Sequence, residues 1–139
     1  MYLIIFYIFI TIGFTQQNLD SKIIDLFMKG EYELLSNNHD DAKYYFEKIL
    51  NMDPSVAVVY LSLSEIDLIK NDLISYSNSL SRAFDFDKSN FEVGIMCANA
   101  YIINEQFNKA ESHLLRLNEY FPNNTEISYA LIELYKISK

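Results

Sequence analysis

The sequence predicts an all-α protein built from helix pairs stacked in series, and three observations lead to this prediction. The ends of three similar stretches recur at a fixed interval: Pro54, Lys88 and Pro122 lie 34 residues apart. Between these positions the apolar residues follow the three- and four-residue spacing of an amphipathic helix rather than the alternation of a strand. The chain also has 3 Gly and 2 Pro in 139 residues, which is typical of packed helices and not of a turn-rich β-sandwich.

Residues 1–15 are predicted to be an export signal. The run MYLIIFYIFITIGF is almost wholly apolar and is followed by a polar stretch that starts at Thr15. This run is shorter than the roughly 20 apolar residues that span a bilayer, and its length suits the apolar region of a signal peptide. Gly13 and Thr15 are small enough to precede a cleavage site, so residues 16–21 would be a linker. The expected location is secreted or periplasmic, in the cell envelope; an uncleaved membrane anchor or a buried helix is the alternative.

The first helix pair is predicted over residues 22–56. Its first helix, from Ser21 to Leu35, carries an apolar stripe of Ile23, Ile24, Phe27, Leu34 and Leu35. Asn37 and Asn38 end it, because Asn tolerates the left-handed backbone conformation. The second helix buries Ala42, Tyr45, Phe46, Ile49 and Leu50 and stops at Asp53-Pro54. Lys29 and Glu33 fall where apolar residues are expected, which predicts a register shift of a residue or two.

Two further pairs are predicted over residues 57–90 and 91–124, with a closing helix over residues 125–139. Their inter-helix turns are placed at Asn71-Asp72 and Glu105-Gln106. The apolar positions of the pairs are Tyr60, Leu61, Leu63, Ile66, Leu68, Ile69, Leu73, Tyr76, Leu80, Ala83 and Phe84, then Ile95, Ala98, Tyr101, Ile102, Phe107, Ala110, Leu114 and Leu117.

These residues resemble the tetratricopeptide repeat. The third pair matches best, with Ala98 and Ala110 at the small positions of its two helices, Tyr101 and Phe107 between them, and Pro122 at the end. The other two pairs keep part of the pattern, at Tyr60, Leu63, Ser64 and Ala83 and at Gly30, Ala42, Phe46 and Asp53-Pro54. The resemblance covers residues 22–139 and implies three repeats and a capping helix, in a right-handed α-solenoid.

Small residues explain the pattern physically. Two antiparallel helices approach closely only where small side chains meet, so Ala98 and Ala110 are expected at a crossing. Tyr76 stands where the second pair should have a small residue. That pair should therefore be splayed, or the Tyr76 ring should turn outward.

The resemblance also implies a binding surface, because the first helix of each repeat commonly lines a concave groove that holds a peptide or helix. The groove positions map onto Phe27, Glu31, Leu61, Glu65, Leu68, Ile95, Asn99, Ile102, Tyr129 and Glu133, with Lys136 at the end. For Leu34, Leu35, Ile102 and Ile103 a core role is the alternative. Some members of the family grip a C-terminal carboxylate with Lys, Arg and Asn in this groove. Here Asn99 has no such Lys or Arg beside it, so that mode is not expected.

Charge and composition narrow the class of partner. The net charge is −8, so binding to a nucleic-acid backbone, which needs clustered Lys and Arg, is not expected. A protein or peptide with apolar and basic residues fits better. Cys97 is the only cysteine and is interpreted as a small apolar core residue. His39 and His113 lie in different pairs without a third ligand or a triad, so neither a metal, a cofactor nor catalysis is expected.

The sequence thus predicts an exported, non-enzymatic interaction module. Two alternatives remain open. The chain could be a structural or assembly subunit that self-associates through its last helix, where Ile132 and Ile137 have no predicted cover. It could instead be an adaptor tethered to a membrane through an uncleaved N-terminal segment.

Overall fold

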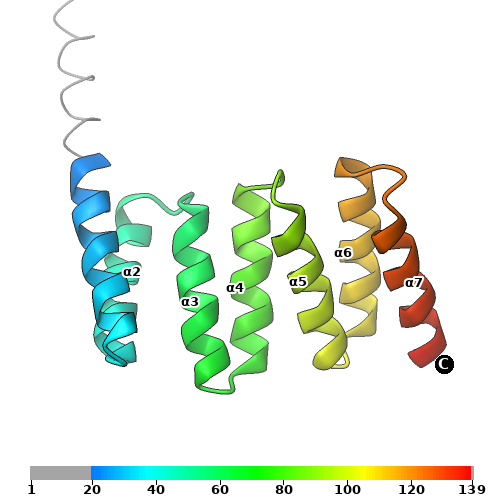
Figure 1. Ribbon diagram of the computed structural model, residues 1–139, viewed down its shortest axis with the longest axis horizontal. Coiled ribbons are helices and arrows are strands. Elements are labelled where there is room, and N and C mark those ends of the chain that lie inside the picture. The colour runs from blue at the N-terminus through cyan, green and yellow to red at the C-terminus, as the bar shows by residue number, and fades with distance from the viewer. Residues whose placement is uncertain (1–19, 139) are drawn as a thin grey trace, which may run out of the picture. The chain divides into compact units, whose positions relative to one another are not determined.

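The computed structural model describes residues 20–138 (Figure 1). Its helices are residues 20–35, α2 (His39–Met52), α3 (Ala57–Ile69), α4 (Leu73–Phe86), α5 (Phe91–Ile103), α6 (Phe107–Tyr120) and α7 (Thr125–Ile137). Residues 20–138 contain no strand, and the all-α class is confirmed. The export signal and most of the linker that the sequence predicts lie outside the described residues. Within them, no helix has both the length and the apolar character needed to cross a membrane.

The chain divides between Pro54 and Ser55 into two compact units. We call residues 20–54 unit 1 and residues 55–138 unit 2. The helices keep the predicted period in both. One series begins at Ala57, Phe91 and Thr125, and the other at His39, Leu73 and Phe107, in each case 34 residues apart.

The turn within each helix pair has the same backbone conformation. Asn37, Asn71 and Glu105 have φ of 61°, 56° and 56°, in the left-handed region. This conformation reverses the chain sharply after a helix, and Asn accepts it more readily than most residues. Where the next helix begins, Asp72 accepts a hydrogen bond from the Ser75 amide at 3.0 Å and so caps α4.

Unit 1 is held together by a close crossing of its two helices. A Cβ atom on Gly30 would lie 2.5 Å from Cε1 of Phe46, so only glycine fits there. Lys29 is exposed and pairs with Asp25 at 2.7 Å, while Glu33 accepts a hydrogen bond from Asn38 at 2.7 Å. Lys29 and Glu33 thus have polar partners on the surface of the helix, and Gly30 lies at the crossing with Phe46.

The predicted apolar stripe of the first helix is partly wrong. Ile24 and Leu35 are 59% and 84% exposed, whereas Leu26 and Leu34 are buried. Leu26, Gly30 and Leu34 follow a four-residue interval, so they share the face of the helix that α2 covers. Of the four residues left open between groove and core, Leu34 thus belongs to the core.

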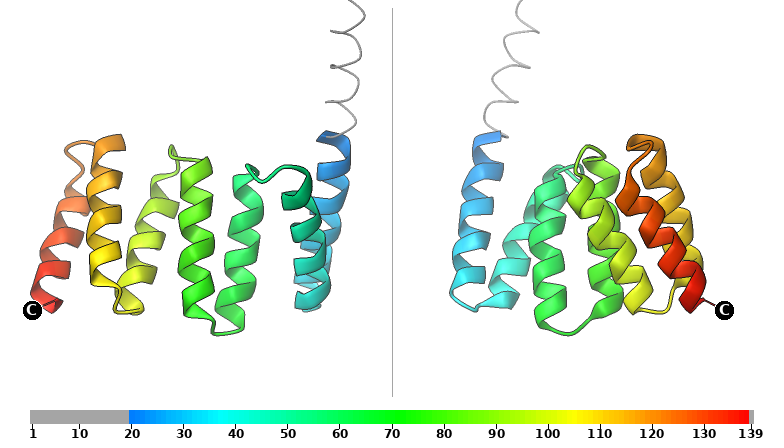
Figure 2. Two further views of the ribbon diagram at one scale, coloured as in Figure 1. Left: turned by 180° about the vertical axis from the view of Figure 1, so that it is seen from behind. Right: turned by 45° about the vertical axis from the view of Figure 1, so that its right-hand side comes forward.

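Unit 2 consists of helices that each pack on the next one in the chain. In Figure 1, α3, α5 and α7 lie in front of α4 and α6, and the view from behind in Figure 2 reverses this order. We call α3, α5 and α7 the front layer and α4 and α6 the rear layer. Between the layers lies a continuous core that includes Leu80, Phe84, Val93, Cys97, Ala98, Tyr101, Ala110, Leu114, Leu117, Ile127 and Leu134.

A close approach of helices in this core lies at Gly94, one helical turn before the predicted crossing at Ala98. A Cβ atom on Gly94 would overlap Leu117 and lie 3.2 Å from Phe84, while Ala98 and Ala110 are both buried. Tyr76 is half-buried at the edge of the core, and α3 and α4 pack along each other. The ring thus packs against the core instead of turning outward, and the pair is not splayed.

Candidate partner-binding surface

Eight of the predicted groove residues lie on the front layer of unit 2. They recur at equivalent positions: Leu61, Ile95 and Tyr129, then Glu65, Asn99 and Glu133, then Leu68 and Ile102. None of these side chains is buried. We call these eight residues the α3–α5–α7 surface.

Apolar side chains dominate the exposed part of these helices. Leu68, Ile103 and Tyr129 are 49%, 63% and 69% exposed, and Val58, Ile69 and Met96 add to them. Exposed apolar patches of this kind are common on the interaction surfaces of proteins in general.

Charge on the front layer is almost wholly negative. Helices α3 and α5 carry Glu65, Asp67 and Glu92 but no Lys or Arg. On α7, Glu133 already accepts a hydrogen bond from Lys136 at 2.6 Å. Of the two carboxylates of this surface, Glu133 is thus paired with Lys136, and Glu65 is exposed.

The two remaining predicted residues belong to unit 1. Phe27 is half-buried and packs on Phe46 with 5.9 Å between ring centroids, and Glu31 is half-buried as well. Phe27 thus supports the helix crossing at Gly30 in addition to presenting part of its ring.

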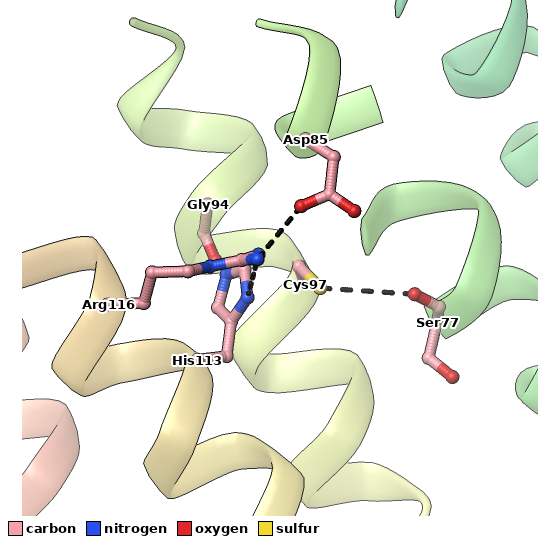
Figure 3. Close-up of polar contacts among 6 residues, drawn as sticks. All are labelled: Ser77, Asp85, Gly94, Cys97, His113 and Arg116. Atoms are coloured by element: carbon pink, nitrogen blue, oxygen red, sulfur yellow. Dashed lines mark hydrogen bonds and ion pairs between the residues drawn. The ribbon is translucent and has the colours of Figure 1, made fainter. Parts of the chain in front are cut away.

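A polar chain that the sequence did not predict joins α4, α5 and α6 (Figure 3). Nη1 of Arg116 lies 2.8 Å from Oδ1 of Asp85, and Nη2 lies 3.3 Å from Nδ1 of His113. Nε2 of His113 lies 2.9 Å from the Gly94 carbonyl oxygen. A carbonyl can only accept, so Nε2 carries the proton and Nδ1 accepts from Arg116.

The surroundings of His113 keep its ring neutral. Burial lowers its pKa below the ordinary 6.5, the hydrogen bond to Gly94 partly offsets this, and the charge of Arg116 lowers it again. With one nitrogen donating and the other accepting, the imidazole has no free position for a substrate or a metal. His113 is thus a packing residue of the core.

Cys97 is also a core residue. It is fully buried, its thiol lies 3.9 Å from the Ser77 carbonyl oxygen, and burial raises its pKa to about 12. A nucleophilic cysteine needs the opposite shift, toward the thiolate. In residues 20–138, no three His, Cys, Asp or Glu side chains gather in a way that could hold a metal ion.

The rear layer bears an open pocket of about 410 Å³. Its lining residues are Ser81 of α4, Tyr101 of α5, and Asn108, Lys109, Ser112, His113 and Arg116 of α6. Sequence reasoning missed this pocket because it followed the first helix of each pair. One signal was present: α4 and α6 carry Arg82, Lys109 and Arg116, whereas α3 and α5 carry no basic residue.

Comparison with known proteins finds similarity in structure only. No protein-family model and no curated protein matches the sequence. Among solved structures, the first TPR of Spaghetti (RPAP3), bound to an HSP90 peptide, is 18% identical with a TM-score of 0.61, covering 84% of this chain and 93% of that one. The Yersinia enterocolitica type III secretion chaperone SycD, in complex with a peptide of the translocator YopD, is 17% identical with a TM-score of 0.64, covering 86% and 96%.

A third similar structure is the TPR domain of Arabidopsis OM64, at 15% identity and a TM-score of 0.59, covering 86% of this chain and 98% of that one. At such identities a structural likeness establishes the fold and nothing finer. All three are tetratricopeptide-repeat domains, and residues 20–138 have the tetratricopeptide-repeat fold.

Proposed function

We propose that the chain is a non-enzymatic interaction module that binds a peptide or helix of another protein on the α3–α5–α7 surface. The observation behind this proposal is the composition of the surface, in which exposed apolar side chains recur on three helices with Glu65 among them. A segment with apolar anchors and a Lys or Arg is complementary to it.

The energetics favour a preformed surface. Leu61 and Ile95 are half-buried and pack against the core of unit 2, so they lose little freedom when a ligand covers them. Apolar area removed from water contributes roughly 25 cal/mol per Å². An ion pair of Glu65 with a ligand cation adds only about 0–1 kcal/mol at an exposed site, so it acts on specificity more than on affinity.

The similar structures support a peptide as the class of partner. Spaghetti is solved with an HSP90 peptide and SycD with a peptide of YopD. We transfer only the class, since neither peptide is identified for this chain.

We also propose that residues 1–15 direct export, which would place the module in the cell envelope or outside the cell. A membrane-tethered adaptor is the alternative. N-terminal sequencing of the mature protein separates the two, because a cleaved chain would begin near Gln16.

The binding test uses Leu61→Glu and a fluorescent helical peptide of leucines and lysines. The variant places a charge among the apolar anchors, so we expect the peptide affinity to fall at least about tenfold, or about 1.4 kcal/mol. Affinity is measured by fluorescence anisotropy, and helical content by circular dichroism.

The matched control is Leu115→Glu on α6, whose side chain is 50% exposed on the rear layer. It makes the same chemical change away from the α3–α5–α7 surface, so the peptide should still bind. Equal losses in both variants would contradict the proposed site, and loss of helical content in Leu61→Glu would make Leu61 a core residue. Light scattering of the free chain at several concentrations tests the alternative of self-association.

A further inference from the structure

The chemistry of the pocket on the rear layer differs from that of the front layer. No carboxylate is among its seven lining residues, and two of them, Lys109 and Arg116, are cations. We propose that this pocket binds a carboxylate side chain of an acidic peptide segment. The inference is independent of the proposed function, which concerns the opposite layer of unit 2.

The two cations have different roles. Arg116 is held by Asp85 at 2.8 Å and by His113 at 3.3 Å, so its guanidinium is fixed and its charge is partly compensated. Lys109 has no carboxylate partner in the described part of the chain. Its Nζ lies 5.7 Å from the centroid of the Tyr101 ring. Lys109 is therefore the group that pairs directly with the ligand, and Arg116 supplies a background positive potential.

The other lining groups suit a carboxylate. The hydroxyl group of Ser81 and the side-chain amide of Asn108 can each donate a hydrogen bond, whereas the Ser112 hydroxyl already donates to the Asn108 carbonyl oxygen at 2.8 Å. Hydrogen bonds to a charged group are stronger than those between neutral groups. His113 contributes shape but no donor, because its Nε2 already donates to Gly94.

The shape of the surface favours a peptide over a compact small molecule. Small ligands are usually enclosed, with most of their surface buried. This pocket is open, and Asn108 and Lys109 also line a neighbouring pocket of about 310 Å³ with Glu105, Gln106 and Phe107. Two pockets that share a wall can hold successive side chains of one extended segment. Because Glu105 stands in the second pocket, the ligand carboxylate belongs in the first.

A nucleic acid fits this pocket less well. Lys109 and Arg116 are its only cations and Asp85 offsets one of them, in a chain of net charge −8. Phosphate backbones are bound through many such contacts at once. A single carboxylate matches the single unpaired cation.

The experiment measures binding of a fluorescein-labelled, glutamate-rich peptide to the full-length chain by anisotropy. Its partner probe has glutamine in place of every glutamate. We expect saturable binding of the first probe alone, weakened about three- to fivefold by Lys109→Gln, which is the size expected for one ion pair at an exposed site. Because Lys109 is exposed at the surface, this variant should keep its helical circular dichroism.

The matched control is Lys88→Gln. Lys88 also lies over a tyrosine ring, at 5.6 Å from the centroid of Tyr120, but it does not line the pocket. This variant loses the same charge and should change the affinity by less than about twofold, because Lys88 does not line the pocket and exposed charges are screened by salt. Equal weakening by both lysine variants would overturn the site in favour of general attraction.

Competition identifies the source of the carboxylate. Unlabelled glutamate-rich peptide should displace the probe at far lower concentration than free glutamate or inorganic phosphate. Displacement by free glutamate at the same concentration would overturn the peptide ligand, and displacement by phosphate alone would overturn the carboxylate.

Discussion

At the scale of single residues, His113 shows how burial decides the role of a titratable group. Its ring touches Phe84 and Tyr101, with 5.2 Å and 6.1 Å between centroids, and both nitrogens have partners. Protonation of the His113 ring would place a second positive charge beside Arg116. The residue therefore couples the packing of α5 and α6 to pH.

We expect the free energy of unfolding to fall as the pH drops below about 6.5. The pKa of His113 is lower in the folded state than in the unfolded state. Once the pH falls below the unfolded-state pKa of about 6.5, the unfolded chain binds the proton more readily and is therefore favoured. Above that pH both states are neutral and His113 contributes no pH dependence. Urea unfolding across this range measures the effect.

The comparison variant is His113→Gln, whose side-chain amide can still donate to Gly94 but does not titrate. It should show a smaller decline in unfolding free energy below pH 6.5 than the unmodified chain. An unchanged decline would assign the pH dependence to other groups.

At the scale of elements, the recurring left-handed turn is the clearest link from sequence to fold. Asn37 and Asn71 occupy it in two helix pairs and Glu105 in the third, where α5 meets α6. The cost of this conformation for an ordinary residue is about 1–2 kcal/mol, and Asn reduces it by hydrogen bonding locally. Glu105 is thus a strained position in a turn that is otherwise well matched.

We expect Glu105→Asn to stabilise unit 2 by roughly 0.5–1 kcal/mol, because it relieves this strain. Thermal and urea unfolding measure the change. Asn71→Glu is the reverse exchange at the equivalent turn and should destabilise by a similar amount. If the two exchanges shift stability in the same direction, backbone strain is not the cause.

At the scale of the whole molecule, the stability of a stacked array is a sum over neighbouring elements. In unit 2, α4, α5 and α6 each pack on a helix before and a helix after, whereas the main packing of α7 is on α6. Tyr129, Ile132 and Ile137 of α7 are consequently exposed.

We expect the backbone amides of α7 to exchange with deuterium faster than those of α5. A helix with one neighbour opens at lower free energy than a helix between two. Hydrogen exchange with mass spectrometry at low protein concentration checks this. Protection of α7 equal to that of α5 would mean that its exposed face is covered, as self-association would require.

Much of the fold could be predicted because the residues that determine each repeat lie close together in the sequence. The 34-residue period, the Asn turns and the small residues at Gly30, Ala98 and Ala110 act within or between adjacent helices. The predicted groove residues of unit 2 are all at least partly exposed, because spacing within one helix also decides which residues share a face.

Other features depended on contacts between distant residues. The pocket joins Ser81 to Lys109 and Arg116, and the polar chain joins Asp85 to Arg116 and Gly94 to His113. Helical spacing tells which residues share a face but not how far a neighbouring helix covers that face. The same limit explains why Ile24 was expected inside and Leu26 was overlooked.

The sequence by itself thus determined the helices, their period and their turns, because these follow from local backbone preferences and side-chain size. Only the tertiary structure decided which polar groups meet across helices: His113 neutral in the core, Arg116 held by Asp85, and Lys109 left without a carboxylate partner in the described part of the chain. Burial and charge pairing depend on distances between elements, and no local pattern encodes those distances.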